Sequence, residues 1–345
     1  MATRLVKRIM VFLLLQAAVI SLLHLPLYIH RTKYSVQLAY LDKLERLQSL
    51  EGERIVFLGD SNTYYGIDSE QVENYFRKPV TNLSIQRATG FHFSMQAGDD
   101  LFRAGDIVLM NPSYPGEYFP WYDEDFNGEG AVILETIEAA PMLARWFSKP
   151  PQVNALLRDL PDSLRRSLDY LRKALTGSVR TFDPYLTRGQ YSKHGDVVAH
   201  IDEPSRVTPD KLLPWPDVPP DMTAIRTMRS YAERWRSRGV RVFVTFQPMV
   251  DSVFNDNRSK VERLWAAIQA ELSDFVIGRP HDFLFPIEEF FDNQRHLLRN
   301  SRRARTATVI RQMEQAGIRP ESDASTRPTQ LQENVQQDNQ QGPTP

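Results

Sequence analysis

The feature that most constrains the fold is a series of short, mostly apolar runs that alternate with helical patterns. Such runs cover residues 55–58, 106–110 and 240–246. A short, mostly apolar run predicts a strand buried on both faces, as in a parallel sheet covered by helices. Further strands are expected at 79–83 and near 283–285, and helices at 69–77, 91–103, 222–238, 258–273 and 299–316. The alternation predicts an α/β fold with a mainly parallel sheet.

The N-terminus carries an apolar run long enough to cross a membrane. Basic residues within 1–8 precede this run, which extends over residues 9–29. About 20 mostly apolar residues suffice for a membrane-spanning helix. A cleaved signal peptide is the competing interpretation, but no small-residue cleavage site follows. The early basic cluster favours a cytoplasmic segment 1–8 with the body outside, although further basic residues at 31–33 nearly balance it.

The remaining chain divides into a linking helix, a main domain and a tail. Leucines recur through residues 35–50 at helical spacing, which predicts an amphipathic helix between the membrane and a domain at 52–318. Residues 113–220 break the strand–helix alternation and predict a largely helical insertion over the sheet, with an independent small domain as the alternative. Residues 320–345 are rich in glutamine and proline, so we expect this tail to be disordered.

Composition excludes several classes of site. The 345 residues are 41% hydrophobic and 25% charged, as in an ordinary folded protein, and the net charge is −1. This balance gives no argument for a nucleic-acid partner. Because the chain has no cysteine, structural disulfides, zinc–thiolate sites and cysteine nucleophiles are excluded. The histidines lack the spacing of a helical metal pair, so we expect neither a metal nor another cofactor.

The first apolar run ends in a turn that presents a serine. Gly59, Asp60 and Ser61 follow the strand directly, which places the serine at the carboxyl end of the sheet, where open α/β sheets bind ligands. The serine also begins the next helix, whose free N–H groups can stabilise a developing negative charge. A simple helix-capping serine is the alternative interpretation. Ser61 is our candidate nucleophile.

A serine nucleophile needs a base, and a histidine near the other end of the chain is the candidate. Asp292 and His296 lie just before the last helix. Histidine can accept the serine proton near neutral pH, and a carboxylate can fix its tautomer. An ordinary surface histidine is the alternative interpretation.

Together, the early Gly59-Asp60-Ser61-Asn62 turn and the late Asp292–His296 pair resemble the SGNH (GDSL-like) hydrolase family in order and spacing. The stretch around His296 is similar to the DxxxH block of a membrane-anchored bacterial branch of that family. The resemblance covers residues 52–112 and 222–315. It implies a three-layer α/β/α sandwich of the flavodoxin-like type and Ser-His-Asp chemistry on an ester.

The resemblance also implies an oxyanion hole, and here the sequence departs from the family pattern. The backbone N–H of Ser61 is one expected donor. The second block has Ser84 where the family has glycine, and Asn111 is the nearest candidate for the third-block asparagine. Asn62 is a further binding candidate beside the nucleophile. An asparagine that caps a turn is the alternative interpretation of Asn111.

Two surface patterns have both a structural and a functional interpretation. Six arginines and no acidic residue occur in 295–311, typical of a solvated helix face, with contact to an anionic glycan or lipid headgroups as the alternative. The aromatic–acidic stretch 114–126 predicts either a packed cap or part of a sugar-binding cleft.

The sequence thus predicts a membrane-anchored, extracytoplasmic serine esterase or O-acyltransferase, periplasmic in a Gram-negative cell. Its expected partners are an envelope polysaccharide or other acylated glycan, and membrane lipid. The membrane-anchored branch of the family also resembles polysaccharide O-acetylation proteins, which implies a multi-span acyltransferase as a further partner. Water or a sugar hydroxyl would accept the acyl group through the same residues. A catalytically inactive SGNH-like scaffold or glycan-binding protein is the alternative, and a membrane lipase is a further one.

Overall fold

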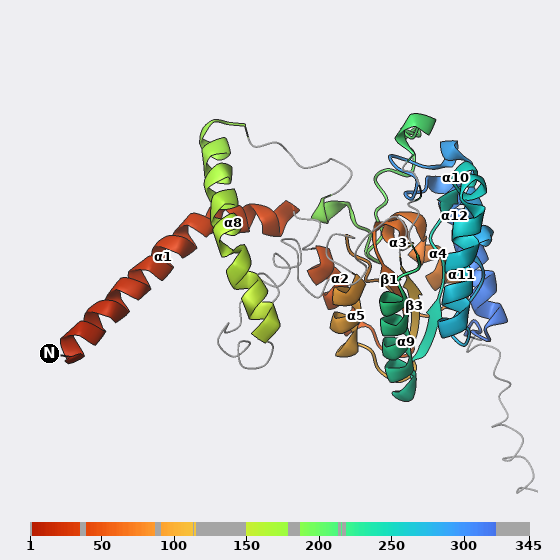
Figure 1. Ribbon diagram of the computed structural model, residues 1–345, viewed down its shortest axis with the longest axis horizontal. Coiled ribbons are helices and arrows are strands. Elements are labelled where there is room, and N and C mark those ends of the chain that lie inside the picture. Colours follow the sequence, from red (N-terminus) through yellow and green to blue (C-terminus); the bar gives the residue numbers. More distant parts are fainter. Residues whose placement is uncertain are drawn as a thin grey trace, which may run out of the picture.

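A mainly parallel four-stranded sheet lies at the centre of the body of the protein (Figure 1). The computed structural model describes residues 2–34, 39–86, 91–112, 114, 150–178, 187–212, 215 and 219–321. The strand order is β2-β1-β3-β4, and each neighbouring pair is parallel. The strands are β1 (Ile55–Gly59), β2 (Val80–Asn82), β3 (Ile107–Asn111) and β4 (Arg241–Val244). The predicted α/β class with a mainly parallel sheet is confirmed.

A parallel bridge between Val244 and Val276 continues the sheet beyond β4. A separate parallel pair joins β5 (Met249–Val250) to β6 (Leu284–Phe285). The strand expected near 283–285 therefore exists, but it pairs outside the main sheet. Its short partner β5 was not expected from the sequence.

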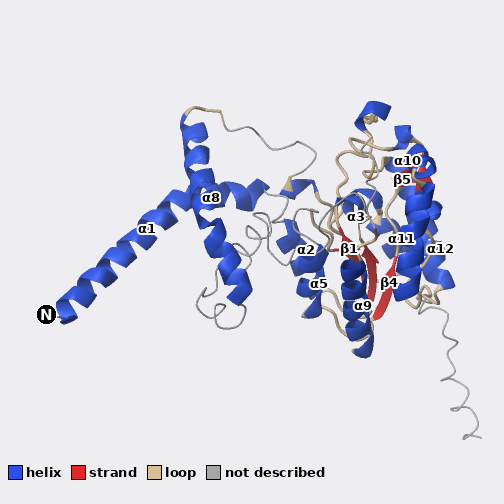
Figure 2. Cartoon of the chain, viewed as in Figure 1, coloured by secondary structure: helices blue, strands red, loops and turns tan. Residues whose placement is uncertain are grey.

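Helices flank the sheet (Figure 2). Contacts join α5 to α9 and α9 to α11, whereas α12 contacts α3 and α4. These helices are α3 (Ser61–Gly66), α4 (Ser69–Phe76), α5 (Phe91–Asp99), α9 (Met222–Ser237), α10 (Asp251–Asp256), α11 (Arg258–Leu272) and α12 (Arg299–Gln315). Their buried apolar side chains and the wholly buried strands β1 and β3 form one continuous core.

The predicted linking helix packs on the domain. It is observed as α2 (Ala39–Ser49), which buries Tyr40, Lys43 and Leu47 and contacts β2. Residues 35–38 lie outside the described residues. The leucine pattern therefore serves packing against the body, where Leu47 is fully buried.

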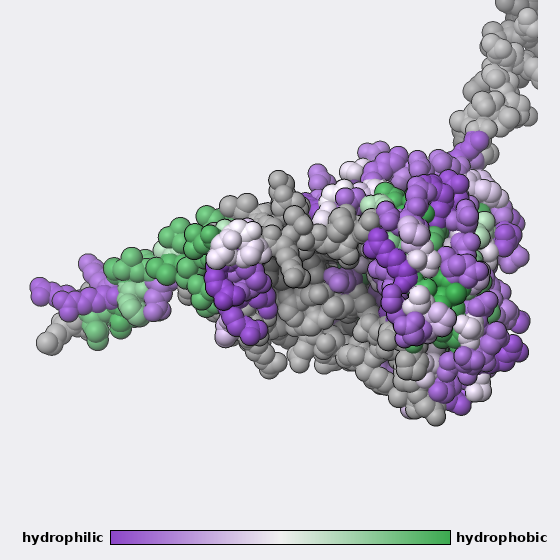
Figure 3. Space-filling view, turned by 90° about the horizontal axis from the view of Figure 1, so that it is seen from above, coloured by the Kyte–Doolittle hydropathy of each residue, from purple (hydrophilic) through white to green (hydrophobic). Residues whose placement is uncertain are grey.

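The N-terminal segment forms one long helix, α1 (Ala2–Tyr34). Among the described residues it is the one helix long and apolar enough to cross a membrane, over Arg4–Leu23, by length and composition alone. A signal sequence shares these properties. Figure 3 shows green apolar side chains along this helix, whereas much of the visible surface of the body is purple and hydrophilic.

The predicted insertion has two described parts. Helix α8 (Pro150–Leu175) contacts α1. Residues 187–212, by contrast, are hydrogen-bonded into the body: Asn82 N–H donates to the carbonyl of His194 (2.7 Å) and Val197 N–H to that of Tyr64 (2.9 Å). Most of the aromatic–acidic stretch and the tail from residue 322 onward lie outside the described residues.

Candidate active site

The turn between β1 and α3 holds Ser61 at the rim of the sheet. Asp60 caps α3, because its carboxylate accepts a hydrogen bond from the backbone N–H of Asn62 (2.9 Å). Ser61 is half-buried in the first turn of the helix. Within the described part of the chain, neither its hydroxyl nor its backbone N–H has a hydrogen-bond partner. Both groups are therefore available to a ligand.

Glycine is required immediately before this turn because the backbone is crowded. A Cβ atom on Gly59 would collide with Oγ1 of Thr63 and lie 2.7 Å from the carbonyl oxygen of Asn111. The parallel register pairs Gly59 with Asn111. Asn111 therefore ends β3 beside the Ser61 turn.

Asn62 is the centre of a buried hydrogen-bond network that fixes α3. Asn111 donates from Nδ2 to Oδ1 of Asn62 (2.7 Å) and to Oγ1 of Thr63 (2.8 Å). Arg305 donates from Nη1 to the backbone carbonyl of Asn62 (2.7 Å) and from Nη2 to that of Phe246 (3.0 Å). Residues from β3 and α12 thus fix the orientation of the helix that begins at Ser61.

The predicted acid–base pair is formed. Oδ1 of Asp292 lies 2.7 Å from Nδ1 of His296. Burial disfavours the charged form of Asp292, but the hydrogen bond and the charge of His296 outweigh it, so the pKa of Asp292 lies below its usual value. An ionised carboxylate at Nδ1 favours the tautomer that keeps Nε2 free to act as a base.

The imidazole of His296 packs against the helix that carries Ser61. The rings of Tyr65 and His296 are stacked, with centroids 3.8 Å apart and planes 11° from parallel. Tyr65 follows Ser61 by four residues, one helical turn along the same face of α3. The imidazole of His296 therefore lies against the last turn of α3, the short helix that Ser61 begins.

Asn293 is a neighbour of the base that the sequence did not identify. Its Oδ1 accepts the backbone N–H of Arg295 (3.0 Å), so its Nδ2 faces the His296 ring. Nδ2 lies 3.4 Å from Nε2 and 2.9 Å from Nδ1. The amide is thus nearer to Nδ1, the nitrogen that Asp292 also contacts, than to Nε2.

No model of a known protein family and no characterised protein matches this sequence. The geometry of the site therefore carries the functional argument.

The other predicted oxyanion donors are directed into the protein in this structure. The N–H of Ser84 points to Oδ1 of Asn82 (3.2 Å), and Ser84 is fully buried. Both Nδ2 interactions of Asn111 are made to α3, and Asn62 is also fully buried. In this structure Asn62 and Asn111 hold the turn that carries Ser61, and their expected role in binding stays a prediction. The N–H of Ser61 is the expected donor that remains available.

His200 supports the pair from the segment 187–212. Its ring lies 4.5 Å from the Tyr65 ring and 5.3 Å from that of Phe291, and Nε2 lies 2.8 Å from the carbonyl oxygen of Leu297. Burial lowers the pKa of His200 to about 4, so it is neutral near pH 7. Sequence reasoning treated this histidine as ordinary, because its neighbours come from α3 and from residues almost 100 positions later.

Lys43 is a buried lysine of α2 that contacts Ser84, the residue of the second family block discussed above. Its Nζ donates to the carbonyl oxygen of Ser84 (2.5 Å) and lies over the rings of Tyr64 and Tyr191, 5.0 and 4.4 Å from their centroids. Burial lowers its pKa to about 7, although the charge of Asp196 opposes the shift. The sequence did not indicate this contact, because a lysine in a leucine-rich amphipathic helix is ordinarily expected on the solvent side.

The prediction that the arginines of the last helix form one solvated face is wrong for Arg302 and Arg305. Arg302 is 4% exposed and donates to Oδ2 of Asp196 (2.9 Å) and to the carbonyl of Ile67 (2.8 Å). Arg305 is fully buried beneath α3. These guanidinium groups satisfy polar groups inside the body and are not accessible to an external anion.

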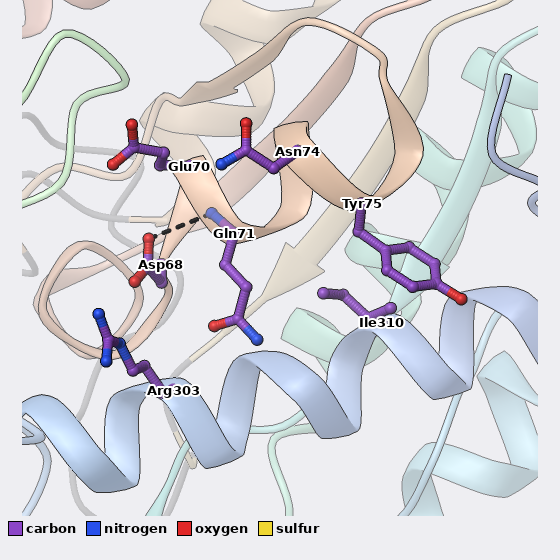
Figure 4. Close-up of a pocket in the computed structure, with 7 residues that line it drawn as sticks. All are labelled: Asp68, Glu70, Gln71, Asn74, Tyr75, Arg303 and Ile310. Atoms are coloured by element: carbon purple, nitrogen blue, oxygen red, sulfur yellow. Dashed lines mark hydrogen bonds between the residues drawn. The ribbon is translucent and has the colours of Figure 1, made fainter. Parts of the chain in front are cut away.

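A surface pocket lies elsewhere, between α4 and α12 (Figure 4). Gln71 and Asp68, which are hydrogen-bonded, lie on one side of it and Arg303 on the other. Its lining includes neither Ser61 nor His296. Among the residues that the structure describes, no group of His, Cys, Asp and Glu side chains is arranged to hold a metal ion.

Proposed function

We propose that this chain is a membrane-anchored serine esterase or O-acyltransferase of the SGNH type, acting on an ester of an envelope glycan. The observation that carries the proposal is the stacking of His296, paired with Asp292, on the Ser61-bearing helix. The strand order β2-β1-β3-β4 with its continuation at Val276 supports a flavodoxin-like arrangement, because it matches the common doubly-wound order.

In the proposed reaction, Oγ of Ser61 attacks the acyl carbonyl carbon while Nε2 of His296 removes the hydroxyl proton. The N–H of Ser61 stabilises the oxyanion. The bond to the leaving alcohol then breaks as His296 returns the proton to that oxygen, which leaves the acyl group on Ser61. Water or a sugar hydroxyl attacks next, and the acid or a new ester leaves. Asp292 orients the imidazole and stabilises its positive form.

Ester hydrolysis by the full-length protein in lipid nanodiscs tests this proposal. We expect the wild type to hydrolyse an aryl acetate and a fluorophosphonate probe to label Ser61. Ser61→Ala should reduce the rate at least about 100-fold, because the nucleophile acts as a unit with its base. Ser237→Ala, at an exposed serine on α9, is the matched control and should be unchanged. Equal rates for wild type and Ser61→Ala would contradict the proposal.

The membrane part of the proposal rests on α1 and its preceding basic residues. An uncleaved anchor with its body outside the cytoplasm predicts that the protein resists carbonate extraction. It also predicts that alkaline phosphatase fused after residue 345 is active. Release of the protein by carbonate, or an inactive fusion, would exclude this topology.

A catalytically inactive glycan-binding scaffold is the second candidate. The observation that favours it is the internal use of the Ser84 N–H and the Asn111 amide, which leaves a reduced oxyanion hole. Binding of an acetylated glycan without turnover, with no probe label on Ser61, would support this candidate. If turnover occurs, a series of acyl chain lengths separates a glycan esterase from a membrane lipase, which should prefer long chains.

A further inference from the structure

Helix α8 is held apart from the sheet and lies against α1. It is 26 residues long and contacts α1, and Figure 1 shows the two helices crossing to one side of the body, in the part of α1 farther from the N-terminus. Among the α1 side chains that the structure describes, Leu23 alone is partly buried. Leu23 also ends the apolar window Arg4–Leu23. The helix α8 is therefore beside α1 in the region where the apolar window ends.

The apolar residues of α8 form one stripe that α1 covers only in part. Leu164, Leu168, Leu171 and Leu175 recur at intervals of three and four residues, so they share one face. Leu164 and Leu171 are partly buried, and Ser167 beside them is fully buried. Leu168 and Leu175, by contrast, are 53% and 89% exposed. One edge of the stripe thus remains open.

Among the described side chains of α8 outside this stripe, the charged ones are mostly basic. Asp169 lies 2.5 Å from Nζ of Lys173 and 3.2 Å from Nη2 of Arg172, and all three side chains are exposed. Arg165 is exposed as well. A helix with leucines on one face and mainly arginine and lysine on the other is typical of segments that lie in the plane of a membrane surface.

We propose that α8 lies in the membrane interface beside the point where α1 leaves the bilayer. Leu168 and Leu175 enter the boundary between headgroups and acyl chains, and Arg172 and Lys173 contact lipid phosphates. The inference rests on the proposed role of α1 as a membrane anchor. The exposed leucines of α8 and the exposed apolar side chains of α1, the helix that α8 contacts, identify lipid as the occupant, because one layer can cover both.

The absence of cysteine makes a direct test possible, since any introduced cysteine is the single label site. Full-length Leu168→Cys and its neighbour Asp169→Cys carry a nitroxide in vesicles of phosphatidylcholine and phosphatidylglycerol. Their accessibility to oxygen, which concentrates in hydrocarbon, is compared with that to a water-soluble nickel chelate. We expect oxygen to dominate at 168 and nickel at 169. Leu14→Cys, within the apolar window of α1, reports on the anchor itself.

Each outcome distinguishes the two proposals. Oxygen dominance at 14 and 168 but not at 169 supports the interfacial helix. Nickel access at 168 with oxygen dominance at 14 overturns the inference and leaves the anchor intact. A label at 168 shielded from both reagents means that protein covers the stripe, which also overturns it. Nickel access at 14 overturns the anchor and, with it, the interfacial helix.

Discussion

Asp292 has a geometric role that a mutation can separate from folding. Asp292→Asn retains the shape of the side chain but removes the charge that selects the His296 tautomer, so we expect kcat to fall roughly 10³–10⁴-fold with little change in KM. The thermal unfolding temperature should barely change near pH 7, because the side chain is 36% exposed. Kinetics on the aryl ester and thermal unfolding measure the two effects. An unchanged kcat would exclude His296 as an Asp292-dependent base.

Lys43 should give the protein a stability that increases with pH. The folded-state pKa is about 7, whereas the unfolded chain retains the proton up to the ordinary value of 10.5. Between these values the unfolded state binds more protons, so the free energy of unfolding rises with pH, by up to about 1.4 kcal/mol per unit. Above pH 10 the raised pKa values of Tyr40 and Tyr64 act in the opposite direction, because their folded forms retain protons that the unfolded chain releases.

Denaturant unfolding at pH 7, 8 and 9 tests this prediction. Lys43→Met should remove most of the slope, and Lys193→Met, at a lysine 67% exposed, should retain it. Parallel pH profiles for wild type and Lys43→Met would show that Lys43 is not the source.

Arg305 is expected to be required for the nucleophile turn. Replacing it by methionine leaves the buried carbonyl oxygens of Asn62 and Phe246 without their donor, which should cost roughly 2–4 kcal/mol of stability. Arg305→Lys should recover only part of the loss, because an ammonium group does not reproduce the guanidinium fork. Arg311→Met, at an exposed position of the same helix, is the control. Equal stability of the Arg305→Met and Arg311→Met variants would contradict this role.

At the scale of elements, the junction of β1 and α3 is the least tolerant of change. Gly59→Ala should destabilise the protein by about 1–3 kcal/mol, because the added methyl group meets Thr63 and the backbone of Asn111. Gly189→Ala, where the added atom meets nothing, should be neutral. Thermal unfolding and probe labelling of Ser61 compare the two variants. A Gly59→Ala protein that unfolds and labels like the wild type would refute the crowding.

Most helices and strands could be predicted because the spacing of their apolar residues in the sequence agrees with the side chains that are buried in the structure. Helix 222–238 was expected and Met222–Ser237 is observed, and the strand expected at 106–110 is observed at Ile107–Asn111. The exceptions depend on distant partners. The strand β5 has two residues and exists through its pairing with β6, which no local periodicity could indicate.

The principal residues of the candidate site could be proposed from the sequence, but the residues packed around them could not. The turn at Ser61 and the pair Asp292–His296 have local sequence signatures. Tyr65, His200 and Lys43 do not, because their importance arises from contacts made across the fold. A buried arginine such as Arg305 looks the same in sequence as the exposed Arg311.

At the scale of the whole molecule, Asp196 joins four segments. Its carboxylate accepts from Ser69 on α4 (2.8 Å from both N and Oγ), from Asn82 on β2 (2.8 Å) and from Arg302 on α12 (2.9 Å), and it lies itself in the segment 187–212. Asp196→Asn leaves the Arg302 cation buried and unpaired. We expect a loss of about 3–5 kcal/mol, measured by denaturant unfolding.

A double-mutant cycle measures the coupling between Asp196 and Arg302. Adding Arg302→Met to Asp196→Asn should cost less than Arg302→Met costs alone, because the cation left unpaired is removed. Strictly additive losses in the free energy of unfolding would show that Asp196 and Arg302 are not energetically coupled.

The hydrogen bond from Arg305 to the turn that carries Ser61 has a consequence for biosynthesis. The ribosome makes β1, β2 and β3 early. The guanidinium of Arg305, which bonds the carbonyl oxygen of Asn62 beside Ser61, is made only with α12, and the imidazole of His296 only shortly before it. A nascent chain that ends before α12 therefore lacks the contacts that hold the Ser61 turn. Premature termination anywhere before α12 should therefore abolish the proposed esterase activity, which would require a nearly complete chain.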